Sequence, residues 1–110
     1  MSEQLTHPDD RLNRVLIPSG RARLLAARGD IEGALALTRE ALTVAAELDV
    51  PETHAEALIA LAEVLRRAGR PLEEEDALRR ALALYERKGN RPSAARIRAQ
   101  LEEFAAVSPP

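Results

Sequence analysis

The sequence contains no cysteine and no tryptophan, and aromatic residues make up only 2% of its 110 positions. Without cysteine there are no disulfides, thiolate metal sites or cysteine nucleophiles. The scarcity of aromatic rings argues against a surface that stacks nucleic-acid bases. Histidine is also rare, since only His7 and His54 occur. These absences predict a protein that is not an enzyme and that holds no metal or other cofactor.

Long apolar runs are absent as well. No segment approaches the roughly 20 consecutive apolar residues that a membrane-spanning helix requires. The N-terminal residues include Glu3, Asp9 and Asp10 and lack the layout of a secretory signal. The net charge of −2 argues against nonspecific binding to nucleic acid. We therefore expect a cytoplasmic protein that binds neither a membrane nor nucleic acid directly.

Alanine and leucine are abundant and together supply more than a third of the chain. Both are strong helix formers, and their spacing of three and four residues predicts amphipathic helices that are separated by glycine and proline. Pro18 either kinks or ends the first helix, and we favour one kinked helix. The predicted helices span residues 9–28, 31–48, 52–68, 71–88 and 92–106. Residues 1–8 are expected to be disordered, 9–106 to form a single domain and 107–110 to be a tail.

An internal repeat with an offset of 40 residues is the most informative feature of the sequence. When Gly29 is aligned with Gly69, identical residues coincide on both sides of the glycine. The matched residues are Ala22, Leu25, Ala41 and Leu42 in the first unit and Ala62, Leu65, Ala81 and Leu82 in the second. Each unit reads as a helix, a tight glycine turn and a second helix. Such a hairpin covers its apolar faces only by stacking on a neighbour.

The second unit carries a pattern of large and small residues that resembles the tetratricopeptide repeat (TPR) family. The residues concerned are Leu58, Leu61, Ala62, Leu65, Gly69, Leu78, Ala81 and Leu82. The resemblance implies an all-α, right-handed stack of two long hairpins, with repeat units at about 15–50 and 55–88 and a C-terminal capping helix at 92–106. The period of 40 exceeds the usual 34 of the family. Residues 81–101 are further similar to the closing segment of TPR arrays in bacterial, actinobacterial-type multidomain regulators.

The resemblance also implies a function. In this family the first helices of the repeats line a groove that receives a peptide or a partner helix, so we expect a non-catalytic protein-interaction scaffold. Ile59 is the one large apolar residue among the groove positions, and it either contacts the partner or packs against the last helix. The groove positions carried over are Ser19, Arg23, Ala26, Glu56, Ile59, Glu63, Arg66 and Arg67.

Two further readings concern partners. Because stacks generally need about three repeats for stability, a second copy could cover the first helix, which predicts a homodimer through residues 9–28. The alternative function is a regulatory, sensor or oligomerisation segment of a bacterial transcription regulator or signalling protein.

The remaining polar and aromatic residues are given structural roles. His54 is expected to be a solvated residue at a helix start, and the acidic run of residues 73–76 to complement the positive end of a helix dipole. Within that run Glu74 is expected to stay in the exposed first turn while Leu72 packs inward. Tyr85 and Phe104 are expected to seal the capping helix rather than to bind a ligand.

Overall fold

Five α-helices make up the described part of the chain, as the computed structural model shows for the backbone of residues 8–107 and the side chains of residues 13–104. They are α1 (Pro8–Ala27), α2 (Ile31–Leu48), α3 (Pro51–Arg67), α4 (Pro71–Lys88) and α5 (Arg91–Val107). No strand occurs between residues 8 and 107, so the predicted all-α class is confirmed. The expected disorder of residues 1–8 and tail of residues 107–110 lie outside the described residues, except that Pro8 begins α1 and Val107 ends α5.

Local signals in the sequence explain where the helices begin and end. The side chain of Asp30 caps α2 by accepting a hydrogen bond of 3.0 Å from the backbone N–H of Gly33. Pro51 and Pro71 each open a helix at a position that needs no backbone donor. Gly69 follows α3 with a φ of 74°, a left-handed conformation that costs glycine little. The turns therefore follow the same 40-residue repeat as the helices.

The turns occur at intervals of 20 residues, which is half of the repeat. A residue with positive φ ends each of the first four helices, and three of these residues are glycines. They are Gly29 (93°), Asp49 (57°), Gly69 (74°) and Gly89 (82°). Accordingly α2, α3, α4 and α5 begin at residues 31, 51, 71 and 91. In its position, α5 is thus the first helix of a third unit.

The proline at position 18 lies inside α1 and does not end it, so the expectation of a single helix is confirmed. Proline has no N–H and cannot donate to the carbonyl of Arg14 one turn earlier. The next residue, Ser19, is buried, and its hydroxyl donates to the carbonyl of Val15 at 2.7 Å.

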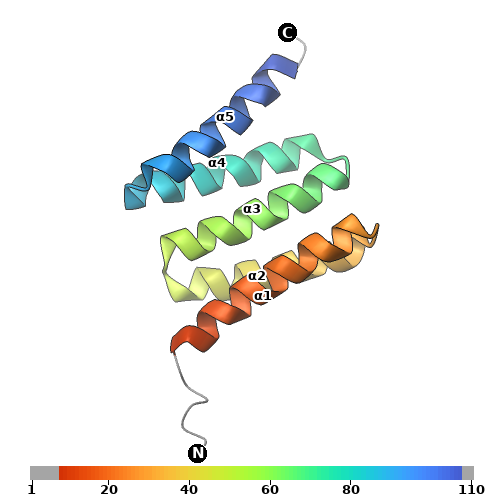
Figure 1. The fold of residues 1–110 in the computed structure, drawn as a ribbon, viewed down its shortest axis with the longest axis vertical. Helices are drawn as coiled ribbons and strands as arrows, with labels where there is room; N and C mark the ends of the chain where they lie inside the picture. The colour runs from red at the N-terminus through yellow and green to blue at the C-terminus, as the bar shows by residue number, and fades with distance from the viewer. Residues whose placement is uncertain (1–7, 108–110) are drawn as a thin grey trace, which may run out of the picture.

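The helices stack in chain order as two hairpins followed by α5 (Figure 1). α1 pairs with α2 and α3 with α4, while α5 packs on α4. The shortest dimension of the molecule is 18 Å, which fits two layers of helices packed about 8–10 Å apart. α3 packs on both helices of the first hairpin, whereas α5 packs chiefly on α4. This arrangement confirms the predicted stack.

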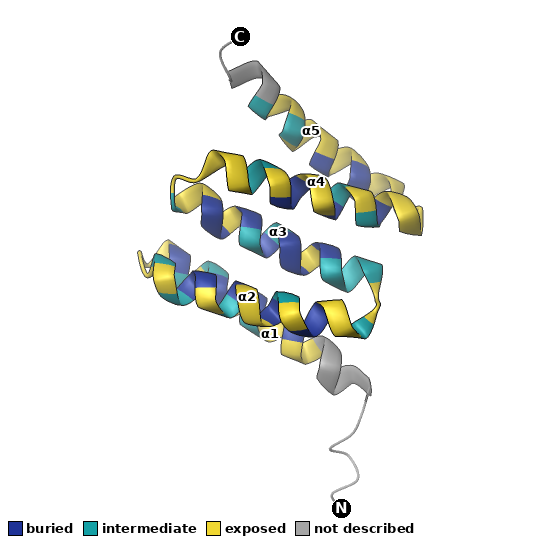
Figure 2. Cartoon of the chain, turned by 180° about the vertical axis from the view of Figure 1, so that it is seen from behind, coloured by how far each residue is buried: buried dark blue, intermediate teal, exposed yellow. Residues whose placement is uncertain are grey.

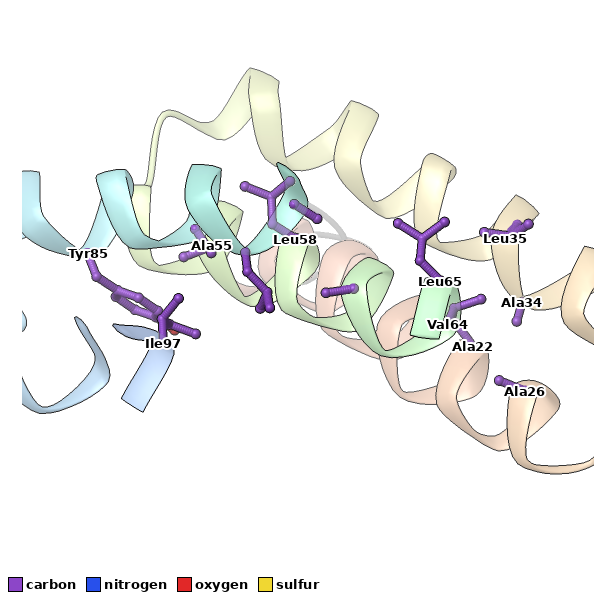
Figure 3. Packing of buried hydrophobic residues seen from close by; sticks show 14 of the residues in the cluster. Ala22, Ala26, Ala34, Leu35, Ala55, Leu58, Val64, Leu65, Tyr85 and Ile97 are labelled. Atoms are coloured by element: carbon purple, nitrogen blue, oxygen red, sulfur yellow. The ribbon is translucent and has the colours of Figure 1, made fainter. Parts of the chain in front are cut away.

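The core is built mostly from alanine and lies around α3, which is the most thoroughly buried helix (Figure 2). Alanine lets paired helices approach closely, and larger side chains fill the space between them. Leu58 and Val64, for example, point from α3 into the cluster that joins the hairpins (Figure 3). A second, smaller cluster joins α1, α2 and α3; its buried members are Val15, Ala41, Val44, Ala45 and Ala57.

The C-terminal end of the stack is closed by α5. Tyr85 of α4 is only 2% exposed and lies beside Ile97 of α5 (Figure 3), while Phe104 packs on the same cluster, as expected for residues that seal the cap. Arg98 of α5 stands where α3 has the buried Leu58 forty residues earlier, and it is exposed and forms an ion pair with Glu86 of α4. A polar outer surface of this kind is typical of the last helix in a repeat stack.

Candidate functional site

Five of the predicted groove positions lie on one side of α1 and α3, which we call the odd-helix face (towards the viewer in Figure 1). They are Arg23, Glu56, Ile59, Glu63 and Arg66. On this face Nε of Arg23 lies 2.6 Å from Oε1 of Glu63. The two residues are 40 positions apart, so the ion pair joins equivalent sites of the two repeats. Their side chains are 39% and 52% exposed, so the pair adds at most about 1 kcal/mol to stability. Both groups therefore remain accessible to a ligand.

Glu56, the second acidic groove residue, is hydrogen-bonded to a buried side chain of the core. Its carboxylate accepts a hydrogen bond of 3.1 Å from the hydroxyl of Tyr85. Burial, together with the nearby negative charge of Glu56, raises the pKa of Tyr85 to about 12. One turn earlier, Glu52 accepts a hydrogen bond of 3.0 Å from the side-chain amide of Asn90. These two carboxylates tie α3 to the end of α4 and to the turn before α5, which leaves Glu63 as the more available acidic group.

The other three groove residues differ in their surroundings. Ile59 is half-buried and packs against the main core cluster, so it offers only part of its side chain to a partner. Arg66 is exposed, and its charge reaches Glu74 of α4. Arg67 is also exposed but lines a hollow beside Ile31 at the start of α2. Arg23, Glu63 and Ile59 therefore lie together on the odd-helix face, whereas Arg67 lies at the hollow beside Ile31.

The assignment of two small residues to the groove is wrong. Ser19 is 3% exposed and Ala26 is 4% exposed. Both fall in line with the buried Val15 and Ala22 at spacings of three and four residues, which places them on the side of α1 that meets the core. A small side chain is compatible with a groove and equally with a close helix contact, so residue type alone did not separate the two.

The expectation that Leu72 packs inward is also wrong, since this side chain is 82% exposed. Leu72 and Glu74 lie about 200° apart around the helix. The buried residues Ala77, Ala81 and Tyr85 fix which side of α4 faces the core, and that side carries Glu74. Glu74 is half-buried as a result, and burial raises the pKa of its carboxyl group.

His54 is half-buried rather than fully solvated. Burial, with a smaller contribution from the positive charge of Arg80, lowers the pKa of its imidazole. The side chain is therefore held neutral near pH 7, and a neutral imidazole could serve as a base or a metal ligand. Within residues 13–104, however, no three His, Cys, Asp or Glu side chains gather as a metal site.

Two shallow hollows open beside α2. One lies between α2 and the end of α3 with the turn that follows it, and the other lies where α2, α3 and α4 meet. One encloses about 520 Å³ and the other about 350 Å³, and both are lined by Leu35 and Arg39. The second also has Leu72 at its edge. These hollows could not be predicted from the sequence, because they exist only once the two hairpins are stacked at a particular distance.

Comparison with known families identifies the repeat. The family model of the tetratricopeptide repeat matches residues 13–87, which is well over half of the chain. The chain belongs to the TPR family. No match was found among curated proteins or among solved structures. Within the described residues, none of the helices is both long enough and apolar enough to cross a membrane.

Membership of the TPR family places the protein among repeats that generally mediate protein–protein interaction and do not catalyse reactions. The matched residues contain both hairpins and stop just before α5. In this TPR protein the Arg23–Glu63 pair lies within the matched region and connects its two repeats. The odd-helix face is therefore a candidate surface for a protein partner.

Proposed function

We propose that the protein binds a peptide or a helix of a partner protein on the odd-helix face and carries out no chemical reaction. The observation that carries the proposal is the Arg23–Glu63 pair, which places accessible groups of opposite charge at equivalent sites of adjacent repeats. Glu103 follows at the same register on α5 and is exposed. Ile59 supplies the apolar contact beside this line of charges, and Arg66 adds a cation.

Charge reversal tests this proposal with little risk to the fold, because the pair contributes at most about 1 kcal/mol. Partners captured from lysate by the wild-type chain are compared with those captured by Glu63→Arg and by the double variant Arg23→Glu/Glu63→Arg. We expect both variants to lose the wild-type partner, since each alters the charge order that a ligand meets. Arg79→Glu, a reversal at an exposed position of α4, is the matched control.

Retention of the same partner by both charge variants would contradict the proposal, as would an equal loss with Arg79→Glu. Ile59→Asp is a weaker test, because that side chain is partly buried against the core and the change also disturbs the core. The alternative role, a regulatory or sensor segment of a larger bacterial regulator, would use the same face for another domain of the same chain. A partner that binds the isolated chain as a separate molecule supports the first reading.

A further inference from the structure

A stripe of alternating arginine and aliphatic residues runs along the exposed side of α1, and we call it the α1 stripe. It consists of Arg14, Ile17, Arg21, Leu24 and Arg28. The spacing of three and four residues keeps all five on one side of a helix. Ile17 is 56% exposed and Leu24 is 60% exposed. Leu16, at 46%, lies on the side of α1 that carries Arg23, seven residues away. Ile17 and Leu24 lie two helical turns apart with Arg21 between them, and exposed aliphatic side chains at this spacing are typical of a surface that binds another helix.

The second repeat shows what covers the same line of residues. Forty positions later, α3 has Ala57 in place of Ile17 and Val64 in place of Leu24, and both are 0% exposed. Ala57 belongs to the cluster that includes Val15 of α1 and Ala45 of α2, and both of these helices pack along α3. On α3 this line is therefore covered by the preceding hairpin, whereas on α1 the equivalent line is open.

The charges of the α1 stripe specify the helix that fits it. Arg21 and Arg28 stand where α3 has Leu61 and Ala68. Neither arginine forms an ion pair with another residue between 13 and 104. Residues 13–28 contain four arginines and no acidic residue. A second copy docked through this line would bring arginine against arginine, and like charges facing each other oppose association.

We propose that the α1 stripe binds an acidic amphipathic helix of a partner protein. Aliphatic side chains seven residues apart on that helix contact Ile17 and Leu24, while carboxylates beside them meet Arg21 and Arg28. The bound helix covers on α1 the line that the preceding hairpin covers on α3. The surface lies at the N-terminal end of the stack, away from the Arg23–Glu63 pair, so this binding is independent of the function proposed above.

A pair of synthetic peptides tests the proposal with the full chain. The acidic peptide is a three-heptad helix with leucine along one side and glutamate beside it, and the matched peptide has lysine in place of every glutamate. Binding is followed by fluorescence anisotropy of the labelled peptide at low and high salt. We expect the wild-type chain to prefer the acidic peptide, with a preference that shrinks as salt screens the charges.

Two double variants separate charge from apolar contact. Arg21→Glu/Arg28→Glu is expected to weaken binding of the acidic peptide by roughly tenfold and to gain affinity for the lysine peptide. Ile17→Ser/Leu24→Ser is expected to lose both peptides. Folding is checked by circular dichroism, and these exposed positions leave the melting curve nearly unchanged.

The matched controls make the same changes elsewhere on the exposed surface. They are Leu72→Ser/Val50→Ser and Arg87→Glu/Arg91→Glu, and both should bind the acidic peptide as the wild type does. Equal affinity of the wild type for the two peptides would overturn the proposal, as would an equal loss in the controls. A wild-type dimer that Ile17→Ser/Leu24→Ser converts to a monomer would overturn it too, because the occupant would then be a second copy, as the sequence suggested.

Discussion

Asp49 is the one residue other than glycine that adopts a positive φ in the described part of the chain. It occupies the turn between α2 and α3, at the place where the turn between α4 and α5 has Gly89. An L-residue in the left-handed region pays a steric cost of about 1–2 kcal/mol, which aspartate partly offsets through its short polar side chain. The first repeat therefore carries backbone strain that its counterpart avoids.

We expect Asp49→Gly to raise the free energy of unfolding by about 0.5–1 kcal/mol, because glycine adopts this conformation without the steric cost. Urea denaturation measures the change. Gly69→Ala is the opposite test, since its φ is 74° and a Cβ there would touch nothing within 4 Å; we expect a loss of about 1 kcal/mol from the backbone alone. A destabilising Asp49→Gly would show that the carboxylate has a role the turn geometry does not require.

Tyr85 is the single tyrosine of the chain and is buried at the junction of α3, α4 and α5. Its pKa is about 12 in the folded protein and near 10 when unfolded. Between these values the folded state keeps a proton that the unfolded state has released. The stability associated with Tyr85 is therefore complete below pH 10 and falls as the pH rises towards 12.

We expect Tyr85→Phe to remove this fall in stability from the interval between pH 10 and pH 12. At neutral pH the variant should be about 0.5–1.5 kcal/mol less stable, because the hydrogen bond to Glu56 is lost. Urea unfolding at neutral and at alkaline pH measures both effects, and phenol absorbance reports the titration directly since no other tyrosine is present. An unchanged alkaline slope in the variant would assign the pH dependence to other groups.

Among the helices, α1 departs furthest from helix-forming rules. Pro18 stands in its interior, and Gly20 follows two residues later. Proline inside a helix removes a backbone hydrogen bond and crowds the preceding carbonyl. Packing on α2 and α3 therefore has to hold α1 in place. The buried Ser19, bonded to the carbonyl of Val15, contributes to this irregular stretch.

We expect Pro18→Ala to increase stability by about 1–2 kcal/mol, because alanine restores the bond to the carbonyl of Arg14 and favours the helix. Part of the gain is offset by the greater freedom of the unfolded chain. Thermal unfolding followed by circular dichroism measures the difference. Gly20→Ala, where a Cβ meets nothing within 4 Å, provides a second measure of how far local helix propensity limits α1. A loss of stability in Pro18→Ala would show that packing of the proline ring is worth more than the missing bond.

The helices could be predicted from the sequence because glycine and proline mark their ends. Gly29, Gly69, Pro51 and Pro71 each fix a boundary, and the observed ends agree with the predicted ones within one or two residues. The left-handed turn at Asp49 could not be predicted in this way, since aspartate carries no comparable signal. Local sequence determined the helices because the forces that end a helix act within a few residues.

Which side of each helix faces the core was harder to predict than where the helix begins and ends. Leu72 is exposed and Ser19 is buried, because each orientation depends on which side of its helix meets a neighbour. Within the odd-helix face, the repeat offset of 40 aligned Arg23 with Glu63, but their contact at 2.6 Å depends on how the two hairpins stack. The bond between Glu56 and Tyr85 joins residues 29 apart and has no signal in the repeat.

At the scale of the whole molecule, each helix packs mainly against helices one or two places away in the chain. Stability in such a stack is close to a sum of neighbour contacts, so a loss at one end does not spread evenly. The C-terminal end depends on α5, which is held on α4 chiefly through the apolar contact near Tyr85 and Ile97.

We expect Ile97→Ala to destabilise the protein by about 2–4 kcal/mol locally, because it removes a side chain that is only 3% exposed. Hydrogen exchange should show α5 losing protection while α2 and α3 keep most of theirs. Ala99→Ser, on the exposed side of the same helix, is the control and should leave exchange unchanged. Uniform loss of protection in all five helices would mean that the stack unfolds as a single cooperative unit.

The turns that recur every 20 residues also govern how the protein would respond to mechanical load. A force pulling on the two ends passes through the helix pairs in series, because most contacts join helices that are consecutive in the chain. The weakest junction then yields first, and the chain lengthens in increments of one helix, roughly 70 Å for 20 residues at full extension. A molecule built in this way unfolds stepwise from its ends under load, while the helices in the middle of the stack stay packed.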